Sequence, residues 1–457
     1  MVQWARPDSR AGSHLLISLI SAMSSKLILA LVWSLTPVPF SFAQSAVSDS
    51  RIHFYQWRVE RDPDDYSNYD HLGSEYLQKA RETGDPVYYG LSEKAYLNAQ
   101  SLLPSSDPDA AGVTAHLAAL FLAEHRFEEA LTLARKALAS KPDLRFAYAT
   151  LGDAQLETGQ YDQAAGSYLK LRASADSDFI PPRTGLEYLS ETRQASLNYI
   201  QGKPDQAIAH MQSATALAQK ANLPKENIAW SQFSLGELYF SIGDLAHAED
   251  AYQAALRSYP NYHRALAWLG QLRAAQGKYA EAAECYRKAI AVIPLPMYAA
   301  ALGDVYSKLG DRDKARMQYR LVDFIARLSA LNQQLFRREL ALFWADHDMR
   351  LPEALEFAQD ELRLRQDVFT WDALAWAQFK NGKTADATGS IEHALAAGTR
   401  DPLLFYHAGM IYDRLGDAGK SAKFLEHALS LNSQFHIFYA ETANLTLERV
   451  KNQAPNL

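Results

Sequence analysis

The sequence has almost no cysteine and no excess of positive charge. Cys285 is the single cysteine among 457 residues, so an intrachain disulfide and a cysteine-based metal cluster are both excluded. The formal net charge is −7, and it becomes −9 without residues 1–43, which hold three basic residues and one acidic residue. Because an acidic chain is a poor counterion for a phosphate backbone, we expect no nucleic-acid partner.

The chain also lacks the short motifs that mark common active sites. It has no His-Glu-x-x-His, phosphate-binding loop, dinucleotide-binding glycine pattern or Gly-x-Ser-x-Gly elbow. Asp346-His347-Asp348 combines side chains that suit a divalent metal. The same residues suit a polar turn in which Asp346 or Asp348 caps the following helix, and we favour that interpretation. We therefore predict no catalytic residue, no metal and no cofactor, and expect a protein that is not an enzyme.

The N-terminus carries the pattern of an export signal. An apolar run from Leu27 to Leu35 follows a basic residue, and Ser41 and Ala43 place small side chains at both positions that a signal peptidase inspects. We predict residues 1–43 as a signal peptide, with Met23 as an alternative start, and a periplasmic or secreted mature protein. The competing interpretation is an uncleaved N-terminal membrane anchor. The run is shorter than the ~20 residues that a bilayer span needs, so we expect no stable membrane insertion after cleavage.

A motif of small and aromatic residues recurs along the chain at an offset of 34 residues. Its clearest copy comprises Leu235, Gly236, Tyr239, Gly243, Ala248, Tyr252, Ala255 and Pro260. The next copy keeps Leu269, Gly270, Gly277, Ala282, Tyr286, Ala289 and Pro294. This pattern resembles the tetratricopeptide repeat, and with the export signal it resembles the exported bacterial type. The resemblance implies an all-α, right-handed superhelical solenoid of helix-turn-helix repeats.

Physical reasons for the motif can be given position by position. A glycine such as Gly236 lets the second helix of a repeat (helix B) approach the first (helix A) closely. Gly243 ends helix A in a left-handed cap, and Pro260 stops helix B before the next repeat. One helix pair cannot bury its own apolar stripe, so the copies must stack in series.

The motif can be placed along most of the chain. We predict ten repeats, starting near residues 66, 111, 145, 188, 229, 263, 296, 334, 368 and 402. An opening half-repeat helix precedes them at residues 44–65, the solenoid covers 66–435, and a C-terminal capping helix and tail occupy 436–457.

One side of the helices A is rich in aromatic residues and single charges. In the repeat class that the sequence resembles, positions 2, 5, 9, 12 and 13 of helix A face the concave surface. Aromatic and methionine side chains among charges of both signs are typical of interaction surfaces. The predicted partner-binding groove comprises Phe146, Trp230, Phe233, Glu237, Phe240, Met297, Lys308, Phe369, Trp376, Phe379, Tyr406, Met410 and Arg414. For each residue the alternative is packing against the neighbouring helix A.

Together these features predict an exported scaffold that binds a peptide or protein segment in the groove, with an envelope-assembly or export complex as one setting. The alternative function is a carrier or sensor that encloses a small molecule or glycan, suggested by Trp230 and Trp376. The sequence leaves the identity of the partner and the oligomeric state open.

Overall fold

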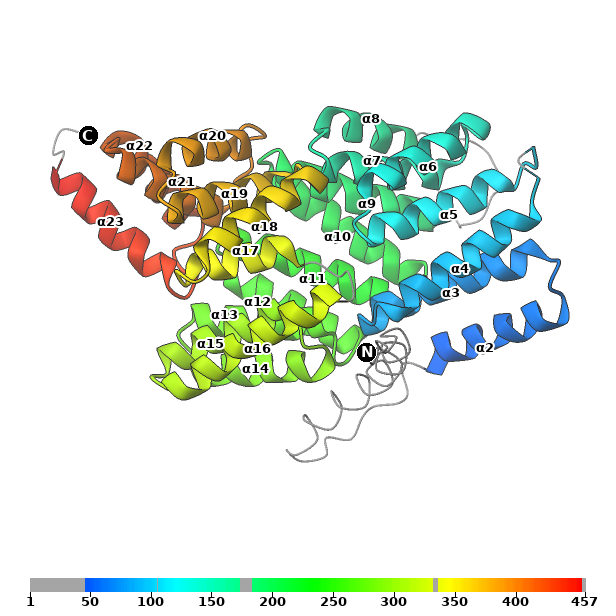
Figure 1. Cartoon of the computed structure of the whole chain (residues 1–457), viewed down its shortest axis with the longest axis horizontal. Helices are drawn as coiled ribbons and strands as arrows, with labels where there is room; N and C mark the ends of the chain where they lie inside the picture. Colours follow the sequence, from blue (N-terminus) through cyan, green and yellow to red (C-terminus); the bar gives the residue numbers. More distant parts are fainter. Residues whose placement is uncertain (1–45, 105, 173–182, 332–335, 454–457) are drawn as a thin grey trace, which may run out of the picture. The chain divides into compact units, whose positions relative to one another are not determined.

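The computed structural model describes residues 46–104, 106–172, 183–331 and 336–453. The predicted signal peptide lies outside these ranges. The described residues from Ser48 onward form one compact unit. Within the described ranges all regular structure is helical, in 22 helices labelled α2 to α23 (Figure 1). This confirms the all-helical solenoid.

Ten helix pairs make up the solenoid. The helices A are α3 (Tyr66–Thr83), α5 (Ala110–Ala123), α7 (Arg145–Glu157), α9 (Arg183–Ile200), α11 (Lys225–Ser241), α13 (His263–Ala275), α15 (Pro296–Lys308), α17 (Arg337–Asp346), α19 (Val368–Lys380) and α21 (Pro402–Leu415). The helices B are α4 (Val87–Leu102), α6 (Phe127–Ser140), α8 (Tyr161–Arg172), α10 (Pro204–Lys220), α12 (Leu245–Ser258), α14 (Tyr279–Val292), α16 (Arg312–Leu331), α18 (Leu351–Leu364), α20 (Thr384–Leu395) and α22 (Ala418–Leu431). Helix α2 (Ala46–Arg61) precedes them and α23 (Tyr439–Gln453) follows.

The observed starts of the helices A follow the predicted register with three differences. The fourth and fifth, α9 and α11, begin five and four residues before the predicted starts, and the eighth, α17, begins three residues after. The other seven lie within one residue of prediction. The motif residues lie where two helices contact each other and not at the helix ends. The motif therefore does not report a helix that is longer or shorter at its end.

At the motif glycine, the aromatic ring of a helix B residue packs against the backbone of helix A. A Cβ added at Gly236 would lie 2.4 Å from Cε1 of Tyr252, whose side chain is fully buried. The same arrangement recurs between Gly152 and Tyr168 and between Gly303 and Tyr319. Gly243 has φ of 79°, as expected for a left-handed cap. The physical interpretation of the motif is confirmed.

Repeats that are five places apart in the sequence also touch. In four cases the glycine in the turn between helix A and helix B lies beside the end of the fifth repeat further on: Gly84 by Ile293, Gly159 by Gln366, Gly202 by Gly398 and Gly243 by Leu431. These are the turns of the first, third, fourth and fifth repeats.

Polar contacts hold these distant segments together. The Gln366 N–H donates to the Glu157 carbonyl over 2.9 Å, and Arg365 pairs with the Glu157 carboxylate at 2.8 Å. The Thr399 hydroxyl donates to the Ile200 carbonyl. The solenoid therefore winds tightly enough for repeats five places apart to contact each other. In a simple repeat array, each repeat contacts only its nearest neighbours.

Candidate functional site

The thirteen residues predicted to form a groove all lie on helices A, but most are not open to solvent. Five are buried in the core: Phe233, Phe240, Trp376, Phe379 and Tyr406 are each at most 7% exposed. Seven are partly buried, namely Phe146, Trp230, Glu237, Met297, Lys308, Phe369 and Met410. Of the thirteen, only Arg414 is exposed, and its guanidinium lies 5.1 Å from the ring centroid of Phe379.

Packing against neighbouring helices accounts for the five buried aromatics. The ring of Phe233 meets Trp268 of α13 edge-on at a centroid distance of 5.6 Å, and Trp376 of α19 lies 5.9 Å from Tyr406 of α21. The prediction that these side chains form an open surface is therefore wrong, because the next helix A and a C-terminal segment cover them. Whether any of the thirteen residues contacts a partner stays a prediction.

Residues 432–441, which we call the strap, connect α22 to the start of α23 and cross several helices A. At one end, the Asn432 side chain donates to the Phe240 carbonyl at the end of α11 over 2.7 Å. At the other end, Lys308 of α15 pairs with Glu441 at 3.3 Å and lies 5.1 Å above the ring of Phe438. Two of the predicted groove residues, Phe240 and Lys308, thus contact the chain's own C-terminal segment.

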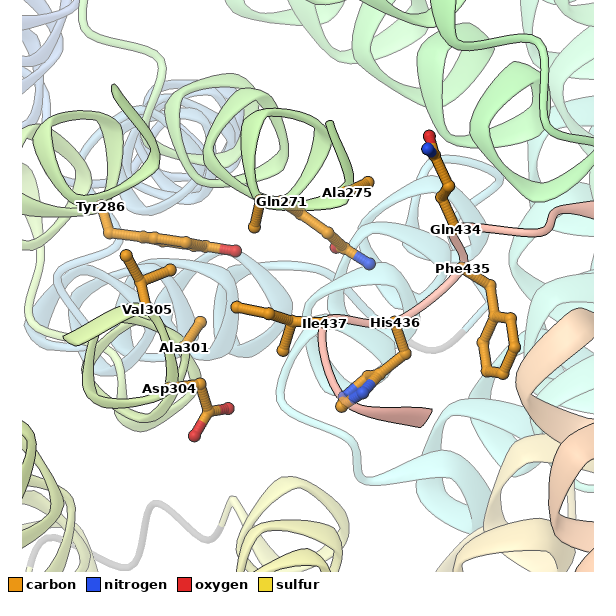
Figure 2. A pocket seen from close by; sticks show the side chains of 11 residues that line it. Gln271, Ala275, Tyr286, Ala301, Asp304, Val305, Gln434, Phe435, His436 and Ile437 are labelled. Carbon is orange, nitrogen blue, oxygen red and sulfur yellow. The ribbon is translucent and has the colours of Figure 1, made fainter. Parts of the chain in front are cut away.

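The middle of the strap fills the space between α13 and α15. Figure 2 shows Ile437 between Gln271 of α13 and Asp304 of α15, with His436 beside it and Phe435 turned away. Ile437 packs on the apolar cluster of these two repeats. The cavity that remains beside the strap has a volume of about 160 Å³. Drug-sized ligands occupy pockets of about 300–1,000 Å³, so this cavity gives no support to the small-molecule alternative.

Aromatic residues of the last two repeats, on α19 and α21, pack against the strap residues Phe435 and Tyr439. Tyr439 stacks on Tyr406 at a centroid distance of 4.5 Å and meets Trp376 edge-on at 5.8 Å. Phe435 lies 5.8 Å from Tyr406 and is 4% exposed. Trp376 and Tyr406 therefore lie together around an internal segment of the chain.

Two carboxylates beside the strap take hydrogen bonds from several elements. Asp346 Oδ1 accepts from Trp376 Nε1 at 2.7 Å and from the Tyr439 hydroxyl at 2.6 Å. Asp304 Oδ1 accepts from the Tyr319 hydroxyl at 2.8 Å and lies 2.7 Å from His347 Nε2. Burial alone would lower the pKa of His347, but the hydrogen bond and charge of Asp304 outweigh it and raise that pKa.

The Asp-His-Asp turn has a different role from the predicted one. Helix α18 begins after Arg350, with no side-chain capping hydrogen bond, so the prediction that Asp346 or Asp348 caps this helix is wrong. Asp348 instead adopts the left-handed conformation, with φ of 51°, where most other repeats have glycine, and its carboxylate pairs with Lys380 at 2.7 Å. The turn joins α15, α19 and α23.

Sequence reasoning missed the strap and its anchor Asp346. A helix was predicted from residue 436, whereas α23 begins at Tyr439, after the His436 ring nitrogen Nδ1 has accepted from the N–H groups of Phe438 and Tyr439. The signal that was available is the run Phe435-His436-Ile437-Phe438-Tyr439 immediately after the last repeat. A linker segment this apolar is expected to pack against another part of the protein or against a partner.

Family comparisons match the repeats directly. A family model described as the MalT-like TPR region matches residues 111–320, and one described as tetratricopeptide repeat matches residues 404–435. Tetratricopeptide-type repeats therefore match these two parts of the chain. No curated protein matches it.

Solved structures of tetratricopeptide-repeat proteins are similar to this chain at low sequence identity. A tetratricopeptide repeat protein from Parabacteroides merdae has 17% identity and a TM-score of 0.34, over 58% of this chain and 99% of its own. Yeast Tom70 has 15% identity and a TM-score of 0.33, over 85% and 96%. PilW, described as a type IV pilus biogenesis factor, has 16% identity and a TM-score of 0.38, over 48% and 92%.

Among the residues that the structure describes, no helix is both long enough and apolar enough to cross a membrane.

Proposed function

We propose that the chain is an exported, non-enzymatic scaffold whose helices A bind a segment of another protein. Tetratricopeptide repeats are protein-interaction modules, which supports a protein partner. The observation that carries the proposal is the strap, since the helix A surface already accommodates a short non-helical segment there through side-chain contacts. We call the helix A residues that contact the strap or line the cavity beside it the strap site; Lys308 and Tyr406 contact the strap, and Gln271 and Asp304 line the cavity.

Export is part of the same proposal. It is supported by the apolar run from Leu27 to Leu35 and by the small residues Ser41 and Ala43. A periplasmic or secreted location would place the helices A in contact with envelope or extracellular proteins, with an envelope-assembly or export complex as the setting. The acidic net charge supports the absence of a nucleic-acid partner.

Site-specific photo-crosslinking in the native host tests the proposal. A photoreactive phenylalanine analogue is placed at Arg414 or Lys308, and at Lys288 on α14 as a control outside the predicted groove. We expect the first two positions to capture a defined protein that the control does not. Equal capture at all three positions, or capture of none, contradicts the proposal. A bound small molecule or glycan detected by native mass spectrometry, without any protein, would favour the alternative function.

A further inference from the structure

The strap makes contacts that a capping helix does not need. A cap has only to cover the exposed apolar stripe of the last repeat, which α23 does by packing on α22. The strap extends further, to α11 through Asn432, to α13 and α15 through Ile437, and to Asp346 at the end of α17 through Tyr439. With the edge-on contact of Tyr439 with Trp376 of α19, it reaches helices A from five repeats other than the last.

Main-chain hydrogen bonds do not tie the strap to these helices. Among the described residues, the hydrogen bonds that backbone N–H groups of the strap donate stay within the strap or go to α22: Asn432 donates to the Ala428 carbonyl, Gln434 to the Asn432 side chain, and Phe438 to the His436 ring. Its attachment to the strap site is made by side chains. Such a segment can leave the site without breaking any backbone pairing with the helices beneath it.

We propose that the strap is a removable occupant of a peptide site, and that a partner protein replaces it with a short segment of the same chemistry. This inference rests on the proposed function, in which the ligand is a protein segment. A linked segment has an effective concentration of roughly millimolar, so the strap excludes weak ligands and admits only a partner that binds the same site better. The strap thereby sets the threshold for partner binding.

The side chains of the strap define what the partner must present. The site takes an aliphatic side chain where Ile437 packs, and aromatic rings on either side of it where Phe435 and Phe438 lie. It takes a hydrogen-bond donor for the Asp346 carboxylate, two residues after the aliphatic position. A carboxylate two residues further on suits Lys308, as Glu441 does. The partner segment is therefore apolar and aromatic, with one donor and one terminal acidic residue.

A labelled peptide tests the inference with the full-length mature chain. The probe is a fluorescein-labelled synthetic peptide with the sequence of residues 432–441, and binding is measured by fluorescence anisotropy. Ile437→Ser in the chain should open the strap, while Leu445→Ser, at a residue of α23 that is 61% exposed, serves as the matched control. We expect the Ile437→Ser chain to bind the peptide at least about ten-fold more tightly than the wild type or the control, because the competing linked segment is weakened.

Hydrogen exchange separates opening from unfolding. In the Ile437→Ser chain, residues 432–441 should lose protection while α19 and α21 keep theirs. If that variant does not fold, Tyr439→Phe removes only the hydrogen bond to Asp346 and should give a smaller increase in peptide binding. A folded and opened chain that does not bind the peptide, or that binds a peptide with serine at the Ile437 position equally well, overturns the inference. Wild-type binding as tight as that of the variant also overturns it.

The outcome is distinguishable from failure of the proposed function. If crosslinking from Arg414 or Lys308 captures a protein but the peptide never binds, the scaffold function stands and the partner uses another surface. If the peptide binds and no protein is ever captured, the strap site exists but the scaffold function fails.

Discussion

A single glycine illustrates how closely the two helices of one repeat pack. A Cβ at Gly236 would lie 2.4 Å from the buried ring of Tyr252, whereas at Gly166, on the exposed side of α8, nothing lies within 4 Å. We expect Gly236→Ala to destabilise the protein by about 1–3 kcal/mol through overpacking. Gly166→Ala should instead stabilise it by about 0.5–1 kcal/mol, because glycine is unfavourable inside a helix. Urea denaturation of both variants measures this, and equal effects would contradict the assigned register.

The carboxyl of Glu237 provides a prediction about pH. Burial raises its pKa to about 7 in the folded protein, against the opposing effect of the Arg264 charge, whereas an unfolded chain has a glutamate pKa of about 4.3. As pH rises between these values, the unfolded state loses its proton first, so folding stability falls and stays lower above pH 7. Glutamine does not ionise, so a glutamine at this position would not cause this loss of folding stability. Glu237→Gln should therefore gain about 1–2 kcal/mol relative to wild type at pH 8, allowing for its partial solvent exposure, and nothing at pH 4.

Chemical denaturation at pH 4, 6 and 8 checks this prediction, with the difference between variant and wild type as the readout. Taking the difference cancels the contributions of other titrating groups. A difference that does not change with pH would show that the Glu237 carboxyl has the same pKa in the folded and the unfolded protein.

At the scale of secondary-structure elements, the contacts between turns of distant repeats can be isolated with two glycines. Gly202 and Gly277 both end a helix A with positive φ, of 69° and 72°. A Cβ at Gly202 would lie 2.0 Å from the Gly398 carbonyl oxygen, while nothing lies within 4 Å at Gly277. Alanine at Gly277 should cost only the left-handed backbone, about 1–2 kcal/mol. Alanine at Gly202 should cost more and should also expose residues 396–401 to hydrogen exchange, although these lie almost 200 residues away in the sequence.

This comparison also tests how the repeats are joined. If both variants lose the same stability, and protection of residues 396–401 is unchanged, the fourth and ninth repeats do not depend on each other. The solenoid would then behave as a series of nearest neighbours, as simpler repeat arrays do.

At the scale of the whole molecule, export predicts a defined mature chain. Expression of the full sequence with an active export system should release a protein that begins at Gln44, because Ala43 occupies the position before cleavage. Intact-mass spectrometry of the exported fraction gives the N-terminus directly. A chain that retains Leu27 to Leu35 and fractionates with membranes would instead support the N-terminal anchor.

Local sequence spacing determined the unit of this fold. The helix pairs, the close approach of the two helices at the motif glycine and most repeat starts could be predicted because they depend on residues within one repeat of about 34 positions. Such contacts repeat the same local geometry, so a single chain carries several copies of the signal. The same reasoning proposed candidate groove residues, since helical periodicity alone indicates which side of helix A faces away from helix B.

Only the tertiary structure decided which of those residues are covered. The rotation from one repeat to the next is small, but over five repeats it brings Gly202 to Gly398 and encloses Trp376 and Tyr406. A motif within one repeat carries no information about the rotation accumulated over several repeats. The strap lies outside the repeat pattern altogether, and its position depends on where Asp346 and Ile437 meet partners from distant helices. Sequence thus determined the repeating unit, and the accumulated winding of the units determined the surface that they present.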